Sequence, residues 1–163
     1  PAGGILSEPV ATFKSTGVGM ATLTVDIGYW TAFEGGRANF PKTVFQKPKY
    51  AIHYLMHSKN LMAWSNAYAT AMGSILEIVP LTDPFDASAR ELAVRVLYGG
   101  RPLQEHLVEI EGSSDGYLTD ADGVVHLPLM RGLHLIATSQ SEPLSGDPGA
   151  ETLKHVASLS FHR

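Results

Sequence analysis

Histidine is the residue type in this sequence best suited to chemistry, because imidazole is the commonest side chain among transition-metal ligands. The chain holds seven histidines and no cysteine among its 163 residues. His53 and His57 form an HxxxH pattern. On a helix the two rings would lie one turn apart and could chelate one divalent ion. On a strand they share a face but lie about 13 Å apart, which is too far for one ion.

A second histidine pair, His126 and His134, flanks a bend at Arg131–Gly132. In a hairpin centred on that bend, the two side chains would lie near each other across two strands. The interpretation that we favour is a polar pair on an exposed sheet face, with a ligand pair as the alternative.

A metal site assembled from distant histidines is a third arrangement, in which His53 or His57 joins a histidine of the second half. The histidines available for it are His106, His126, His134 and His155. From these arrangements we take the candidate ligands of a divalent transition metal to be His53, His57, His126 and His134.

Other sequence patterns argue against calcium binding and against catalysis. Asp120 and Asp122 lie in a TDADG turn, but no glutamate follows at the offset that an EF-hand loop needs. These carboxylates are expected to cap the turn. No nucleophile elbow, phosphate loop, HExxH motif or paired-carboxylate pattern occurs. We therefore expect a protein that is not an enzyme.

Composition excludes several further classes. The hydrophobic fraction is 44% and the charged fraction 17%, values typical of a globular protein. The net charge of −4 includes no basic block, so a nucleic-acid partner is not expected. The apolar stretches are too short for a helix that inserts into a membrane. The chain begins at Pro1 rather than methionine, which suggests a processed N-terminus.

The elements that must position these side chains are predicted to be strands. Glu91–Tyr98 alternates between apolar and mostly polar or small residues, and Gly99–Gly100 then marks a tight turn. Further strands are expected at four segments: His106–Glu111, Val124–Met130, Leu133–Ser139 and His155–Phe161. Short strands at this spacing are typical of an antiparallel β-sandwich, so residues 74–163 are predicted to form an immunoglobulin-like or transthyretin-like sandwich.

The first half, residues 1–73, is predicted to be a β-rich region in the form of a truncated sandwich. Met20–Tyr29 is strand-like. Lys49–Ala71 lacks glycine and proline and is compatible with a helix, but its alternation favours a strand through His57. Two small sandwiches packed in tandem are the alternative organisation.

Four segments together resemble a known family. They are LEIVPLTDP at Leu76–Pro84, VRVLYGGRPLQEHLVEI at Val94–Ile110, TDADGVVHLPL at Thr119–Leu129 and ASLSF at Ala157–Phe161. They resemble an exported domain family of unknown function that is associated with nickel-uptake substrate-specific components. The later segments also resemble transthyretin-like, Cna-B-like and carboxypeptidase-regulatory-like sandwich modules.

The resemblance implies an exported, non-catalytic binding or accessory domain in the periplasm or at the cell surface. Its cofactor would be a divalent transition metal (nickel, cobalt or zinc). Its partners would be that ion, a membrane transporter component or another envelope protein, or a second copy of the chain. The alternative is a structural or protein-interaction module of the cell envelope that binds no small ligand.

Overall fold

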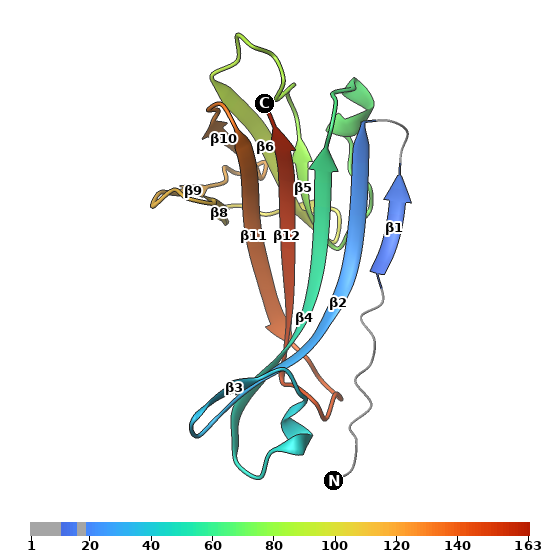
Figure 1. Ribbon diagram of the computed structural model, residues 1–163, viewed down its shortest axis with the longest axis vertical. Helices are drawn as coiled ribbons and strands as arrows, with labels where there is room; N and C mark the ends of the chain where they lie inside the picture. The colour runs from blue at the N-terminus through green and yellow to red at the C-terminus, as the bar shows by residue number, and fades with distance from the viewer. Residues whose placement is uncertain (1–10, 16–18) are drawn as a thin grey trace.

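Residues 11–15 and 19–163 are described by the structure, a computed structural model shown in Figure 1. Pro1 lies outside the described residues. The strands are β1 (Ala11–Ser15), β2 (Met20–Phe33), β3 (Gly36–Ala38), β4 (Pro48–Leu61), β5 (Leu76–Pro80), β6 (Glu91–Tyr98), β7 (Arg101–Pro102), β8 (Leu107–Ile110), β9 (Gly116–Leu118), β10 (Val124–Pro128), β11 (Leu133–Pro143) and β12 (Thr152–His162). Two short 3₁₀ helices, η1 (Lys42–Val44) and η2 (Asn66–Ala69), complete the described elements.

The larger sheet joins strands from both halves of the chain. Its order is β1-β2-β4-β12-β11-β8-β9, and β3 pairs with β2 at one end. All neighbours are antiparallel except β4 and β12, which run parallel from Ile52 opposite Thr152 to Leu61 opposite Phe161. The predicted division at residue 73 stays a prediction, but the strands before and after it form one continuous sheet.

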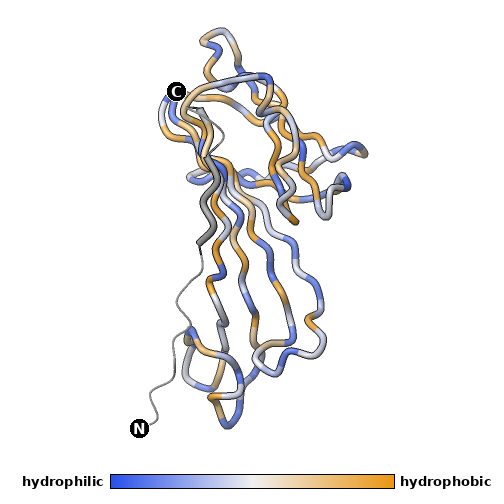
Figure 2. Tube along the Cα trace, turned by 90° about the vertical axis from the view of Figure 1, so that its right-hand side faces the viewer, coloured by the Kyte–Doolittle hydropathy of each residue, from blue (hydrophilic) through white to orange (hydrophobic). Residues whose placement is uncertain are grey.

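The smaller sheet has the order β10-β6-β5, with β7 paired to β6. It covers one end of the large sheet only. Figures 1 and 2 show that β2, β4, β11 and β12 run on beyond it as a single layer. We call the face of the large sheet toward the small sheet the inner face and the opposite face the outer face.

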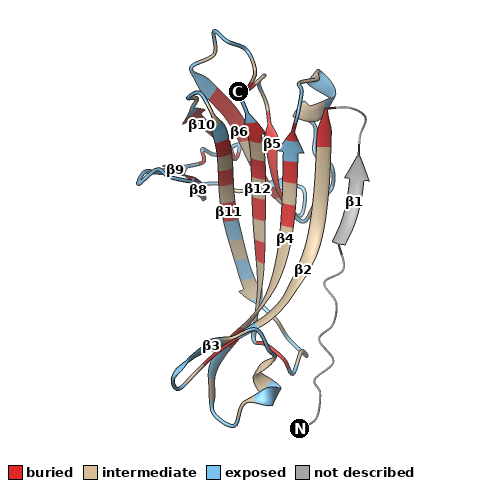
Figure 3. Cartoon of the chain, in the orientation of Figure 1, coloured by how far each residue is buried: buried red, intermediate tan, exposed pale blue. Residues whose placement is uncertain are grey.

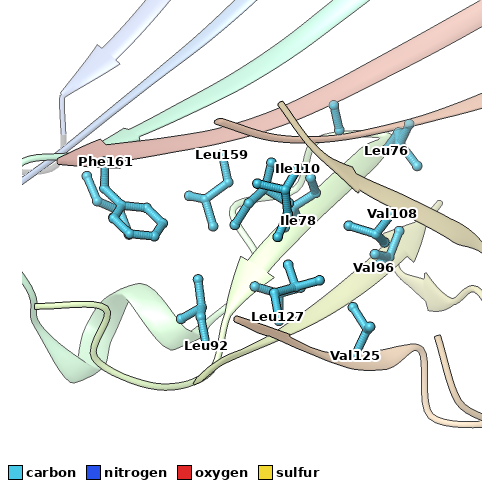
Figure 4. Close-up of a cluster of buried hydrophobic side chains, with 14 of the residues drawn as sticks. Leu76, Ile78, Leu92, Val96, Val108, Ile110, Val125, Leu127, Leu159 and Phe161 are labelled. Carbon is cyan, nitrogen blue, oxygen red and sulfur yellow. The ribbon is translucent and has the colours of Figure 1, made fainter. Parts of the chain in front are cut away.

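The hydrophobic core lies where the two sheets overlap. Figure 3 shows buried residues gathered in that half, and Figure 4 shows the side chains packed between the layers. Alternate residues of β12, namely Ala157, Leu159 and Phe161, point into this core and are at most 1% exposed. From the small sheet, Ile78 of β5 and Leu127 of β10 belong to the same core.

The predicted all-β sandwich is confirmed, and so is the strand in the ambiguous segment, because β4 runs from Pro48 to Leu61. The hairpin predicted around Arg131–Gly132 is wrong. β10 belongs to the small sheet and β11 to the large one. The bend therefore carries the chain from one layer to the other. In this arrangement β10 and β11 face each other across the core, and both supply apolar side chains to it.

Replacement of Phe161 by alanine is expected to lower the free energy of unfolding by about 3–5 kcal/mol, because the buried ring leaves a cavity. Phe161 packs on Phe85 and His134 with ring centroids 6.1 and 4.8 Å away. Leu133→Ala is the control, since Leu133 is 73% exposed and should change stability by less than about 0.5 kcal/mol. Urea denaturation measures both, and equal effects would contradict this placement of the core.

Candidate functional site

The inner face of the large sheet changes character where the small sheet ends. At the end of the large sheet that the small sheet covers, Phe161, Leu61 and Met20 lie side by side on β12, β4 and β2. Further along the same strands, the inner-face positions become polar and carry His57 and His155. Both histidines are buried, with 8% and 3% of their surface exposed. The site therefore lies at the boundary between the two-layer and single-layer parts of the fold.

The two imidazoles face each other through one nitrogen each. His57 Nε2 lies 3.2 Å from His155 Nδ1. The ring planes are 22° apart and the centroids 5.5 Å apart. Without a metal, one ring donates its N–H to the other.

The remaining nitrogen of each ring faces an oxygen atom. His57 Nδ1 lies 3.4 Å from Thr24 Oγ1. His155 Nε2 is buried and has no hydrogen bond, and the nearest carboxylate oxygen, on Glu142, is 3.6 Å away. Tyr98 lies edge-on to the His155 ring. Thr24 and Glu142 therefore flank the pair, and the two facing nitrogens point at each other.

Burial keeps these imidazoles neutral. Desolvation lowers the pKa of His57, and the neighbouring His155 lowers it further, while Glu77 opposes the shift. Desolvation also lowers the pKa of His155, against the effect of Glu142. Desolvation and Glu142 raise the pKa of Tyr98 to about 12. Near neutral pH both imidazole rings of the pair are therefore uncharged.

A buried ion pair supports the wall of the site. Lys59 of β4 donates to Glu77 of β5, and the two residues are only 4% and 2% exposed. Glu77 also accepts the backbone N–H groups of Met72, Gly73 and Ser74 at 2.6, 3.0 and 3.1 Å. The segment it holds forms one side of an open hollow of about 340 Å³ that leads to His57. Thr22, Thr24 and Ile75 complete its lining.

The chain matches the model of a family described as a domain of unknown function (DUF4198), over residues 7–142. The chain belongs to this family. No curated protein and no solved structure matches the chain. The matched range includes most of residues 1–73, which hold none of the four resembling segments. It ends before β12, so His57 lies within the family match and His155 lies beyond it.

Of the predicted ligands in this DUF4198 chain, His53 shares the inner face of β4 with His57 but belongs to a separate cluster. Its Nε2 lies 2.7 Å from Asp26 Oδ1, and its Nδ1 lies 3.9 Å from Asp147 Oδ2. Tyr29 stacks on the ring and donates to Asp147 at 2.9 Å. Because β4 is a strand, the structure does not bring His53 and His57 together.

His126 and His134 lie apart from each other and from the facing pair. His126 is exposed on β10, where Glu91 Oε2 is 3.7 Å away. His134 is buried on β11, stacked against Phe161 and hydrogen-bonded to the backbone oxygen of Met130 at 2.7 Å. The two side chains thus lie on different sheets, each with a partner other than the facing pair.

In the described part of the chain, no three histidine, aspartate or glutamate side chains converge as a complete metal cage. Among the described residues, the facing pair brings two ring nitrogens within 3.2 Å of each other. Sequence reasoning had listed His155 among the distant partners of His57. It missed Glu142, Lys59 and Glu77, although a lysine at an inward position of a predicted strand is a usable signal of a buried partner.

Lys59→Met is expected to lower the free energy of unfolding by about 3–5 kcal/mol, because it leaves the buried Glu77 carboxylate without its cation. The double variant Lys59→Met/Glu77→Gln should recover part of this loss. Lys47→Met, at an exposed position, is the control and should stay within about 0.5 kcal/mol of the parent. Chemical denaturation gives all three values, and a Lys59→Met variant as stable as the control would contradict a structural role for the pair.

Acid is expected to destabilise the metal-free protein. The pKa values of His57, His106 and His155 are lowered in the fold by burial. In the unfolded chain they return to about 6.5, so the unfolded state binds more protons below that pH. The free energy of unfolding should therefore fall as pH drops below about 6.5, and level off once the folded-state pKa values are passed.

His106→Gln tests this pH dependence, because the buried Nε2 of His106 has no hydrogen-bond partner. Denaturation at pH 7 and pH 5 should show a smaller loss of stability than in the parent. His126→Gln, at an exposed position, serves as the control for the replacement of a histidine by glutamine. The same pH dependence in parent and His106→Gln would refute the assignment.

Proposed function

We propose that this chain is an exported, non-catalytic binding domain that holds a divalent transition metal between His57 and His155. Nickel and cobalt are the first candidates and zinc is the third. The observation that carries the proposal is the pair of facing imidazole nitrogens, 3.2 Å apart and buried at the end of the sandwich.

The spacing of the two nitrogens fits a shared ion. Two imidazole nitrogens bound to one ion at about 2.0–2.1 Å each lie roughly 3–3.4 Å apart in tetrahedral or octahedral geometry. The distance between His57 Nε2 and His155 Nδ1 therefore suits a chelate as well as a hydrogen bond. Small adjustments of the two rings would turn both lone pairs toward the ion.

The surroundings of the pair also fit. Metal-bound histidines usually direct their other ring nitrogen at a carboxylate or another oxygen, which fixes the tautomer and the ring orientation. Glu142 stands in that position for His155, and Thr24 for His57. The lowered pKa values leave the rings unprotonated, which metal binding requires.

The rest of the coordination shell would come from solvent or from a transferred ligand, through the hollow beside His57. Two protein ligands make a weaker site than a closed cage of four. Such a site suits a domain that takes up an ion and passes it on. Imidazole ligands favour nickel, copper and zinc over calcium or magnesium.

The exported location and the role in uptake are supported by the family resemblance and are compatible with a cysteine-free chain. In the described part of the chain, no helix is long and apolar enough to span a membrane. The proposed partner is a transporter component or another envelope protein that accepts the ion.

Calorimetric titration of the metal-stripped protein with Ni²⁺, Co²⁺ and Zn²⁺ near neutral pH tests the proposal. One ion should bind per chain, and His57→Gln or His155→Gln should weaken binding at least tenfold, a loss of about 1.4 kcal/mol. His53→Gln is the matched control, because it lies on the same face of β4 but outside the pair. His126→Gln controls for exposed histidines.

The variants separate the alternatives. Binding that survives in both pair variants and disappears in His53→Gln would move the site to the Asp26 and Asp147 cluster. No binding by the parent would refute the metal proposal and favour an interaction module of the envelope, for which the next measurement is the oligomeric state.

A further inference from the structure

The outer face of the single-layer part presents aromatic side chains in the middle of the sheet. Trp30 of β2 lies opposite Ile52 of β4, between the outer-face positions of Tyr50 and Tyr54. Trp30 and Tyr50 are 41% and 40% exposed, and Tyr54 is half-buried. Diagonal neighbours on adjacent strands lie about 7–8 Å apart, so the three rings form a continuous aromatic platform.

The neighbours of Trp30 on its own strand are small. Gly28 and Ala32 occupy the outer-face positions on either side of it, opposite Tyr54 and Tyr50. Ala32 itself is only 7% exposed, so the accessible part of the platform is the indole of Trp30 and the exposed part of Tyr50. A flat ligand can lie on these two rings.

A cation stands over each end of the platform. The guanidinium of Arg37 lies 6.0 Å from the Tyr50 ring centroid, and the ammonium of Lys154 lies 5.9 Å from that of Tyr54. By register, the described outer-face positions of β2, β3, β4 and β12 hold no carboxylate. This face is therefore cationic although the chain as a whole carries a net charge of −4.

The strands beneath the platform decide how a ligand can be recognised. β4 is an interior strand, and β2 is paired on its other side with β1 along Ala21–Val25 and with β3 along Thr31–Phe33, so only a short stretch of β2 edge between them lies outside a described ladder. On the sheet face itself, recognition comes from ring faces and cations. Pyranose rings offer apolar C–H faces to the electron-rich face of an aromatic ring, and uronate carboxylates pair with arginine and lysine.

We propose that this platform, formed by Trp30, Tyr50 and Tyr54 with Arg37 and Lys154, binds an acidic polysaccharide of the uronic-acid type. Tyr50 and Tyr54 are four positions apart on β4, which corresponds to about 13 Å, so the ligand is a chain of several sugars rather than a monosaccharide. Single-stranded nucleic acid also stacks on aromatic rings, but it needs a basic groove along its backbone. Two cations at opposite ends of the platform do not make one. This site is independent of the metal site, which lies on the opposite face.

Tryptophan fluorescence tests the proposal directly, because the chain has two tryptophans, Trp30 and Trp64. In a Trp64→Phe background, Trp30 alone reports on the platform. Titration with polygalacturonate in the presence of EDTA should change its emission saturably, and added salt should weaken the response. Dextran, a neutral polysaccharide, should produce at least tenfold weaker binding.

Variants with intact folds make the test decisive. Arg37→Met/Lys154→Met should raise the polygalacturonate Kd at least tenfold, and Tyr50→Leu/Tyr54→Leu should do the same, with far-UV circular dichroism unchanged. His126→Ala, on the small sheet, should bind like the parent. No response to polygalacturonate, equal binding of dextran, unchanged binding in the double variants, or tighter binding of poly(dT) or polyglutamate would each overturn the proposal.

Discussion

The ion pair between Lys59 and Glu77 is the interaction on which the rest of this structure depends. It joins β4 of the large sheet to β5 of the small sheet where apolar packing gives way to polar side chains. A charge buried to this extent is costly unless it is fully partnered. Glu77 meets that condition with one ammonium and three backbone N–H groups, and by doing so it fixes the segment that leads into β5.

This constraint explains where the histidine pair lies. His57 is two residues before Lys59 on the same face of β4, so the strand that carries the ammonium also carries the imidazole. The segment held by Glu77 stands beside that imidazole and limits its exposure, while the hollow keeps a path to solvent. A buried donor pair with one open side is compatible with the proposed ion site.

The two faces of the single-layer part then have separate chemistries. The inner face holds imidazoles and carboxylates. Their positions continue, along the same strands, the alternate positions that point into the core. The outer face holds aromatic rings and cations. A sheet that is half covered thus leaves both faces partly accessible, one for each of the two proposed sites, whereas a fully packed sandwich would bury one of them.

Local pattern was enough to predict much of the fold. Alternation identified β6 and β12, and it favoured a strand at His57 over a helix, which removed the local chelate. The parallel pairing of β4 with β12 could not be predicted, because the partners are about 100 positions apart and no short-range signal sets their register. That pairing is what brings His155 to His57. The failed hairpin has the same origin, since a glycine bend does not show whether the chain stays in one sheet or crosses to the other.

Crystals of the protein soaked in Co²⁺, with data collected at the cobalt absorption edge, give the most direct test of the central claim. The account predicts one strong anomalous peak about 2.1 Å from both His57 Nε2 and His155 Nδ1. A peak found instead at the exposed His126, or at His53 between Asp26 and Asp147, would contradict it. So would a map with no peak at the pair under conditions where the soaked ion is bound elsewhere on the chain.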